Sequence, residues 1–400
     1  MKIVIATPIL YNAISPFNHL LKDIIDGFLD DGIEIVHLVA VENKAETDLK
    51  YGFHGTNIQY KLYKRKNSEH GNIVSRYLRD SITNIREAIG ILKLKNADVL
   101  FEDVSYSSFW SVLAAKLKGI KVVAMIQDVW PDNAVQSHLI SDGSLLYRYF
   151  EIWQRYVYKK ADRIICISDD MKAFIVSKGV PKNKIEVIYN WGYDDDIVDI
   201  AWDDNEFVKK YNLNRDIFYA VYAGNIGKMQ NVEIVVNAAK ELQDRKDIQF
   251  LIIGDGARRK AIESIAAGMK NITMFPMQPT NLATHVYSVA NVNIIPLVPN
   301  GLNTSLPSKI GVCLSCGKPV IACVNSGSAF QKMVEEYESG FVVSSNSGIE
   351  LARVVRKLRE LNIHQKKYNL FLEKFRRTPN VKKYVEVVRG QNDKEITSNR

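Results

Sequence analysis

Residues 303–324 read NTSLPSKIGVCLSCGKPVIACV, and this stretch decides the fold class of the chain. Pro307 is tolerated in a first helical turn, so Ser308, or the Thr-Ser pair before Pro307, can cap a short helix. Gly317 suits the left-handed position that ends a helix, and the apolar run 320–324 is typical of a buried parallel strand. A loop, a short helix and a buried strand in this order predict an α/β fold.

The same stretch places Ser308 and Lys309 at the expected N-terminus of the helix, at an open edge of the sheet. Unpaired backbone N–H groups and the positive end of the helix dipole favour an anion there, and a lysine adds positive charge. A phosphate site is therefore one interpretation. An ordinary helix–strand pair without a ligand is the other, and this stretch alone leaves both open.

The composition is that of a globular protein with two domains. The chain has 400 residues, 46% of them apolar, which suits two domains of roughly 150 to 200 residues each. Lys and Arg (53) exceed Asp and Glu (45), a mild excess that suits phosphorylated substrates or an anionic membrane surface. The basic residues are dispersed without a recognised module, so we expect no nucleic-acid partner. The apolar N-terminus is too short for a signal peptide, and no apolar run reaches about eighteen residues, so we expect a cytoplasmic chain that does not span a membrane.

Strand and helix patterns alternate along the chain. The opening pattern is strand–helix–strand, the unit of a parallel sheet, whereas residues 51–67 look irregular. The expected strands are 2–8, 33–41, 98–101, 121–126, 163–167 and 185–188 in the first half, and 218–223, 249–253, 272–275, 292–296, 320–324 and 341–343 in the second. We therefore predict two Rossmann-like, doubly wound parallel-sheet domains, residues 1–192 and 193–375, that face each other across a cleft. A helix at about 376–392 is expected to return to the first domain.

Two glycine turns follow expected strands of the second domain. They read GNIGK (224–228) and GDGARR (254–259). Glycine lets a backbone approach a phosphate, although many such turns use it only for tight packing. These two turns and Ser308 would all lie at the carboxyl edge of one sheet, and that convergence favours a ligand that carries phosphate.

Other chemistries find little support in the sequence. The acidic run 194–196 lies in the expected connector without a helper ligand, so a solvated loop is favoured over a metal site. Cys313 and Cys316 have a CxxC spacing, but no second pair or histidine lies nearby, which favours reduced, buried thiols. Motifs of zinc proteases, hydrolases, P-loop enzymes and dehydrogenases are absent.

Asp128 is the carboxylate that we single out in the first domain. It follows the expected strand 121–126 in the sequence QDVWPD, and its neighbours Trp130 and Pro131 would hold the loop in shape. The carboxyl end of a strand is where open α/β sheets keep their chemistry. A turn or N-cap carboxylate is the alternative interpretation.

Taken in order, the motifs resemble the retaining glycosyltransferases of family 4, which have the GT-B arrangement of two facing Rossmann-like domains. The resemblance covers nearly the whole chain, in the stretches TPILYNAISPF, IQDVWPDNA, IICISDDM, VIYNWGY, YAGNIGKMQN, FLIIGDGARR, ANVNIIPL and PSKIGVCLSCGKPVIA. The tryptophan–proline loop and the PSK start of the short helix resemble the subgroup that builds bacterial capsule, O-antigen and exopolysaccharide repeats.

The resemblance implies a hexosyl- or N-acetylhexosaminyl-type transferase without metal or other cofactor. Its donor would be a UDP-linked nucleotide sugar bound by the second domain, and its acceptor would be a lipid-linked saccharide presented by the first. The implied donor-binding residues are Gly224, Asn225, Gly227, Lys228, Gly254, Asp255, Gly256, Arg259, Met277, Leu306, Ser308 and Lys309. The implied acceptor-side residues are Asn12, Gln127 and Trp130, with Asp128 as the catalytic residue near the reacting sugar.

The chain departs from the family pattern at three places. Val312 and Thr304 stand where many members carry two glutamates, the second of which contacts ribose. Asn225 and Gln230 replace an arginine and a lysine of the first donor loop, and Gln127 or Asp128 stands at the place of a common histidine. Two other functions therefore remain open: a sugar-nucleotide epimerase of the same architecture, and a non-catalytic nucleotide-sugar-binding partner.

Two expected helices of the first domain mix cations with aromatic residues. One carries Arg76, Arg79, Arg86, Lys93 and Lys95, and the other Tyr147, Arg148, Tyr149, Trp153, Arg155, Tyr156, Lys159 and Lys160. Such a mixture predicts peripheral contact with the inner face of the cytoplasmic membrane, where the lipid-linked acceptor would lie. The alternative is that the aromatic rings face the core and the cations are merely solvated.

Overall fold

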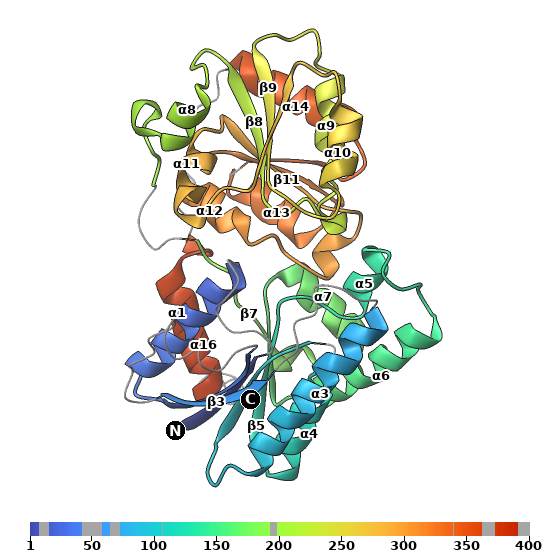
Figure 1. The fold of residues 1–400 in the computed structure, drawn as a ribbon, viewed down its shortest axis with the longest axis vertical. Coiled ribbons are helices and arrows are strands. Elements are labelled where there is room, and N and C mark those ends of the chain that lie inside the picture. Colours follow the sequence, from blue (N-terminus) through green and yellow to red (C-terminus); the bar gives the residue numbers. More distant parts are fainter. Residues whose placement is uncertain are drawn as a thin grey trace. The chain divides into compact units, whose positions relative to one another are not determined.

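The computed structural model describes residues 1–7, 16–41, 58–64, 73–105, 107–192, 198–338, 340–361 and 373–390. The chain divides into two compact units (Figure 1). The first contains Met1–Tyr189 and Thr378–Arg400, and the second contains Asn190–Arg377. These limits lie close to the expected ones, and the predicted cleft stays a prediction.

The first unit is built on a parallel seven-stranded sheet in the order β3-β2-β1-β4-β5-β6-β7. Its strands are β1 (Lys2–Thr7), β2 (Glu34–Val41), β3 (Ile58–Lys64), β4 (Val99–Asp103), β5 (Lys121–Ile126), β6 (Arg163–Cys166) and β7 (Ile185–Val187). Its helices are α1 (Pro16–Asp30), α3 (Ile73–Leu92), α4 (Phe109–Leu117), α5 (Asp132–Gln136), α6 (Leu145–Lys160), α7 (Asp169–Ser177) and α16 (Arg377–Arg389). The strand order reverses between β1 and β4, which marks the switch point of a doubly wound sheet.

The second unit repeats this plan with a six-stranded parallel sheet in the order β10-β9-β8-β11-β12-β13. Its strands are β8 (Phe218–Ala223), β9 (Ile248–Ile253), β10 (Ile272–Phe275), β11 (Val292–Pro296), β12 (Val320–Val324) and β13 (Gly340–Ser344). Its helices are α8 (Glu206–Tyr211), α9 (Glu233–Lys240), α10 (Arg259–Ala266), α11 (Ala283–Ser288), α12 (Lys309–Ser315), α13 (Ala329–Glu336) and α14 (Gly348–Leu361). Every residue of β8, β11 and β12 is buried, as expected for strands covered on both faces.

The predicted fold class of two parallel α/β domains is confirmed, and several strands have the expected bounds. The interpretation of residues 51–67 as irregular was wrong for 58–64, which form β3 alongside β2. This strand lies at the end of the sheet, and its sequence IQYKLYK interrupts the apolar run with polar residues, as is typical of edge strands. Helix α8 was likewise missed; the side chain of Asn205 caps it by accepting hydrogen bonds from the backbone of Phe207 and Val208.

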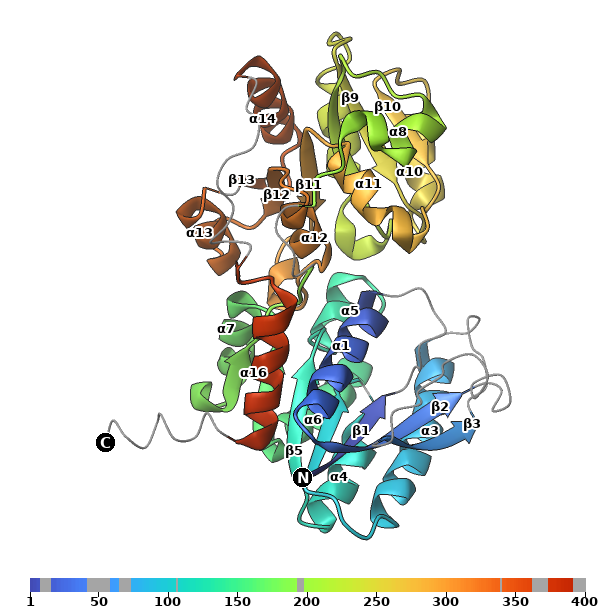
Figure 2. The same ribbon diagram turned by 90° about the vertical axis from the view of Figure 1, so that its left-hand side faces the viewer.

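Helix α16 completes the first unit from the far end of the chain, beside α1 (Figure 2). The side chain of Tyr384 is fully buried, with its ring centroid 6.0 Å from that of Phe101 on β4. A Cβ at Gly27 would lie 2.2 Å from Cγ1 of Val381, so α1 approaches α16 closely only because Gly27 has no side chain. None of the helices in the described part of the chain is long and apolar enough to cross a membrane.

We predict that Tyr384→Ala destabilises the first unit by about 3–5 kcal/mol, because the substitution leaves a cavity beside Phe101. Lys383→Ala is the matched control on the exposed side of α16 and should change stability by less than about 0.5 kcal/mol. Hydrogen exchange measured by mass spectrometry would locate the effect. Unchanged exchange in β1 and β4 of the Tyr384→Ala variant would contradict the role assigned to α16.

Candidate functional site

The candidate site lies at the carboxyl edge of the second sheet, where the strand order reverses between β8 and β11. Gly224 directly follows β8, and Gly254 directly follows β9. Backbone hydrogen bonds join the two turns: Gly224 donates to Ile253 at 2.9 Å, and Ile226 donates to Asp255 at 2.7 Å. The two glycine turns are therefore joined to each other and are not two separate loops. We call the joined turns, residues 224–228 and 254–259, the glycine ledge.

The glycines of this ledge have different reasons to be glycine. A Cβ at Gly254 would lie 1.8 Å from the carbonyl oxygen of Gly224, and one at Gly256 would lie 2.5 Å from that of Ile226. Tight packing of one turn on the other explains both. A Cβ at Gly224 would instead meet only the amine of Lys309, 3.6 Å away. The backbone at Gly224 is therefore shielded by no side chain other than that of Lys309.

Lys309, the first residue of α12, brings its amine to the end of β8. Its Nζ donates to the carbonyl oxygen of Ala223 at 3.2 Å and lies 3.8 Å from the ring centroid of Tyr222. No ion pair joins it to any carboxylate of the described residues. Burial lowers the pKa of Lys309 to about 8, while Cys313 and Cys323 act in the opposite direction. A desolvated cation without a counter-ion is costly, so the site is suited to receive an anion.

The other expected donor-binding residues differ in how accessible they are. Lys228 and Asn225 are exposed, as are Asp255 and Met277, whereas Leu306 is only 5% exposed and contributes to the core. Ser308 occupies the position before α12, but its hydroxyl makes no capping hydrogen bond, so the expected side-chain cap is wrong. That hydroxyl, beside Lys309, is therefore not used by the helix.

Both arginines of the GDGARR turn are engaged inside the second unit. Arg258 contacts Glu233 at 2.5 Å. Arg259 donates to the carbonyl oxygen of Gly254, to that of Phe275 at 3.0 Å and to Glu263 at 2.7 Å. Arg259 thus joins the carboxyl ends of β9 and β10 through its guanidinium group.

Thr304, at one position where the family pattern has a glutamate, is fully buried and donates to the carbonyl oxygen of Gly301 at 3.3 Å. Val312, at the other, is partly exposed on α12. Neither position supplies a carboxylate to the site. The departure seen in the sequence therefore also holds in the structure.

In the first unit, Asp128 is exposed just beyond β5, and Asp103 ends the neighbouring strand β4. Burial, and then the charge of Asp128, raise the pKa of Asp103 to about 7. Asp103 was not predicted from the sequence. The available signal was a second acidic residue at the carboxyl end of an adjacent parallel strand, and the structure brings the two carboxyl groups close enough to interact.

The loop that carries Asp128 is held in place by its flanking residues. Asp132 forms an ion pair with Lys178 at 2.8 Å and accepts a hydrogen bond from Tyr147 at 3.1 Å. The ring of Trp130 lies against Phe150, with 5.3 Å between centroids. Gln127 is partly buried, whereas Asn12 and the acidic run 194–196 lie outside the described residues. The loop is therefore anchored to α6 and α7.

Thiol and metal chemistry gain no support. All four cysteines are free and buried, and burial raises the pKa of Cys316 to about 12, so its thiol stays protonated. Within the described residues, no group of three His, Cys, Asp or Glu side chains is arranged to hold a metal ion.

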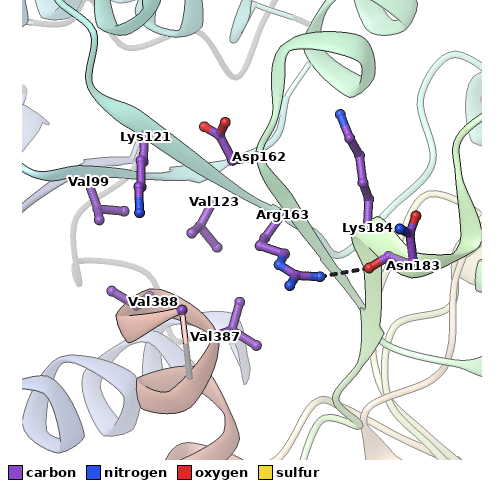
Figure 3. A pocket seen from close by; sticks show the side chains of 10 residues that line it. Val99, Lys121, Val123, Asp162, Arg163, Asn183, Lys184, Val387 and Val388 are labelled. Carbon is purple, nitrogen blue, oxygen red and sulfur yellow. Dashed lines mark hydrogen bonds between the residues drawn. The ribbon is translucent and has the colours of Figure 1, made fainter. Parts of the chain in front are cut away.

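A cavity of about 490 Å³ lies in the first unit at the opposite, amino edge of the sheet (Figure 3). Lys121, Arg163 and Lys184 line it together with apolar side chains such as Val387. Arg163 donates to the carbonyl oxygen of Asn183 at 2.7 Å, and Lys184 to that of Ala161 at 3.1 Å. These cations satisfy carbonyl groups at element ends. Since parallel sheets keep ligands at the carboxyl edge, we do not place the functional site here.

Two protein-family models match consecutive parts of the chain. "Glycosyltransferase Family 4" matches residues 24–194, and "Glycosyl transferases group 1" matches residues 218–360. Probable glycosyltransferase WbjE of Pseudomonas aeruginosa is 24% identical over 250 residues, which is 61% of this chain and 61% of WbjE. Putative colanic acid biosynthesis glycosyl transferase WcaI of Escherichia coli K12 is 24% identical over 230 residues, 56% of each chain. Both matches span less than two thirds of the relative.

A solved structure extends the likeness to the whole chain. HepE of Anabaena, crystallised with UDP, is 13% identical in sequence and has a TM-score of 0.73. The structural match covers 98% of this chain and 100% of the HepE chain. At this identity the likeness concerns the fold alone. The two Rossmann-like units are those of the GT-B fold.

We predict that Gly254→Ala breaks the ledge, because its Cβ would overlap the carbonyl oxygen of Gly224 and its φ of +155° is strained for alanine. Gly268→Ala is the matched control: its φ is +80°, but nothing lies within 4 Å of the added Cβ. Gly254→Ala should lower the melting temperature clearly more than Gly268→Ala, which should cost about 1 kcal/mol. Equal melting temperatures would show that the turns are not packed as described.

Proposed function

Because the chain belongs with the family 4 glycosyltransferases, we propose that it transfers a sugar from a UDP-linked donor to a saccharide acceptor, with retention at the anomeric carbon. The observation that carries this proposal is the partly buried amine of Lys309, which lies at the end of β8 and has no carboxylate partner among the described residues. A sugar nucleotide supplies a diphosphate that would neutralise this charge. The UDP bound to HepE, which shares the fold, supports the choice of nucleotide.

The donor site is proposed on the second domain. The diphosphate would be contacted by the amine of Lys309, by exposed Lys228 and by the hydroxyl of Ser308, which the helix does not use. Gly224, without a side chain, leaves the backbone open to the phosphate oxygens. Departure of the nucleotide places negative charge on the diphosphate, and cations that are already in position stabilise that charge most when transfer occurs. These groups do the work that a divalent ion would otherwise do, so we propose a metal-independent transfer.

The acceptor is proposed to be a saccharide of a cell-surface polysaccharide, carried on a lipid and presented by the first domain. The similarity to WcaI, a putative colanic acid biosynthesis glycosyl transferase, supports this class of acceptor. Asp128 and Asp103 would face its hydroxyl groups from the carboxyl edge of the first sheet. Because its pKa is raised to about 7, Asp103 is partly protonated near neutral pH, so the pair can offer both a hydrogen-bond donor and acceptors to a sugar.

We predict that Lys309→Met weakens UDP binding by about 1.5–3 kcal/mol, or roughly ten- to hundredfold, because a charged hydrogen-bond donor is lost. Lys332→Met removes an exposed cation of α13 and should leave the affinity unchanged. Isothermal titration calorimetry gives both values. Binding that vanishes with EDTA and returns with Mg²⁺ would contradict metal independence.

The pH dependence of UDP binding tests the same residue. The amine of Lys309 is charged below its pKa of about 8 and neutral above it. Affinity for UDP should therefore fall as the pH rises through and beyond this value, since a bound diphosphate moves the pKa upward. Lys309→Met should lose this dependence. A wild-type affinity that stays constant from neutral pH to well above pH 8 would rule out Lys309 as the phosphate contact.

We predict that Asp128→Asn keeps the fold and lowers turnover by about a hundredfold, because the shape is preserved while the charge is lost. Asp142→Asn changes an exposed carboxylate of the same domain and should have no effect. Sugar transfer from radiolabelled donors to extracted lipid-linked saccharides measures turnover, and calorimetry measures stability. Wild-type turnover in Asp128→Asn would identify the residue as a turn carboxylate only.

A further inference from the structure

Helix α3 presents an apolar stripe to solvent. Leu78, Ile82, Ile85, Ile89 and Leu92 are each between 38% and 57% exposed. Their spacing of four and three residues places them on one side of the helix. Ala88 and Ile91, on the other side, are buried against the unit. Single exposed apolar residues are ordinary. Five of them along one side of the same helix form a continuous patch that needs an explanation.

Helix α6 repeats the pattern. Leu145, Tyr149 and Ile152 are 85%, 39% and 68% exposed and share one side of the helix. Helix α4 packs against both α3 and α6 (Figure 1) and adds Leu117, which is 71% exposed. Lys118 donates to the carbonyl oxygens of Leu92, at 3.1 Å, and Leu94, which fixes the end of α4 to that of α3. The three helices thus form one layer with apolar residues on its outer side.

Cations predominate among the charged residues beside these stripes. Arg86 and Lys93 are exposed next to the stripe of α3, whose described acidic residues Asp80 and Glu87 are buried. On α6, Arg148, Arg155, Lys159 and Lys160 are exposed, and the only carboxylate of that helix, Glu151, is paired with Arg155 at 3.0 Å. An apolar stripe with cations along its border is the pattern of a helix that lies in the interface of an anionic bilayer.

Of the four aromatic residues expected to touch the membrane, Tyr149 is exposed in the stripe of α6, but the other three have another role. The ring of Trp153 lies 3.7 Å from that of Phe109, and the ring of Tyr156 lies 4.7 Å from it, measured between centroids. They therefore join α6 to α4. Tyr147 is likewise used inside the unit, by Asp132. The side chains of Arg76 and Arg79 lie outside the described residues. The aliphatic residues, rather than these rings, are the ones left exposed.

We infer that the outer side of the α3–α4–α6 layer inserts its aliphatic stripes into the surface of an anionic lipid bilayer. This deepens the proposed function, because a lipid-linked acceptor has to be reached at a membrane. Aliphatic side chains reach the acyl region, and the bordering cations remain at the phosphate groups. A second protein copy is a poorer occupant, since the border charges of two such faces would repel each other.

Binding of the full chain to vesicles tests the inference without using activity. The chain should float with vesicles of phosphatidylcholine and phosphatidylglycerol and bind phosphatidylcholine alone about tenfold or more weakly. The triple variant Ile82→Gln, Ile85→Gln, Ile89→Gln should lose about tenfold or more in vesicle affinity at any salt concentration. Arg86→Glu with Lys93→Glu should lose it mainly at low salt. Ile265→Gln and Ile349→Gln, at positions 51% and 60% exposed in the second unit, are controls that should bind as wild type.

Insertion has a separate readout. Because the four native cysteines are buried, Ile85→Cys gives one accessible thiol for an environment-sensitive fluorophore. Its emission should shift to the blue on anionic vesicles and be quenched by lipids brominated in the acyl chain. Protein that does not float, a label that stays unquenched, or dimers in ultracentrifugation that the triple variant dissociates would each overturn the inference. UDP binding of the same variants should be unchanged, so failure here is distinct from failure of the donor site.

Discussion

Parallel pairing of the strands is the constraint on which the rest of the structure depends. In both sheets all pairings are parallel, so the carboxyl ends of the strands meet along one edge. Each strand must then return through a crossover, and the turn after it is free to carry chemistry. The ledge of Gly224 and Gly254, the amine of Lys309, and the carboxyl groups of Asp103 and Asp128 are all consequences of this geometry.

Much of the fold could be predicted from the sequence, because strands covered on both faces are continuous apolar runs with glycine or proline at their ends. Residues 121–126, 218–223, 272–275, 292–296 and 320–324 have the same bounds in the structure as in the prediction. Strand β3 could not be found this way, since an edge strand mixes apolar and polar residues. Helix α8 is only six residues long and depends on the cap by Asn205 rather than on periodicity.

The candidate site was harder to predict, because its properties depend on partners distant in sequence. Lys309 stood out as a cation near a helix start, but the loss of solvent that lowers its pKa and its approach to Ala223 need the folded sheet. The pKa of Asp103 is raised by its burial in the folded sheet and then by the charge of Asp128, and neither is visible in the sequence. Arg259 was expected from the sequence to bind the donor, and the structure adds that its guanidinium contacts the carbonyl oxygens of Gly254 in its own turn and of Phe275 at the end of β10. Side chains that serve the protein and those that serve a ligand look alike until their contacts are known.

The return of α16 to the first unit has a consequence for the order in which the chain folds. The first unit consists of Met1–Tyr189 and Thr378–Arg400, so its sequence is interrupted by the whole of the second unit. A ribosome makes the chain from its N-terminus and domains fold as units, so the second unit is complete in sequence before α16 has been made. Until then, Phe101 lacks the ring of Tyr384, and the groove that Gly27 leaves on α1 stays unfilled. The half of the protein that is synthesised first is therefore the half that closes last.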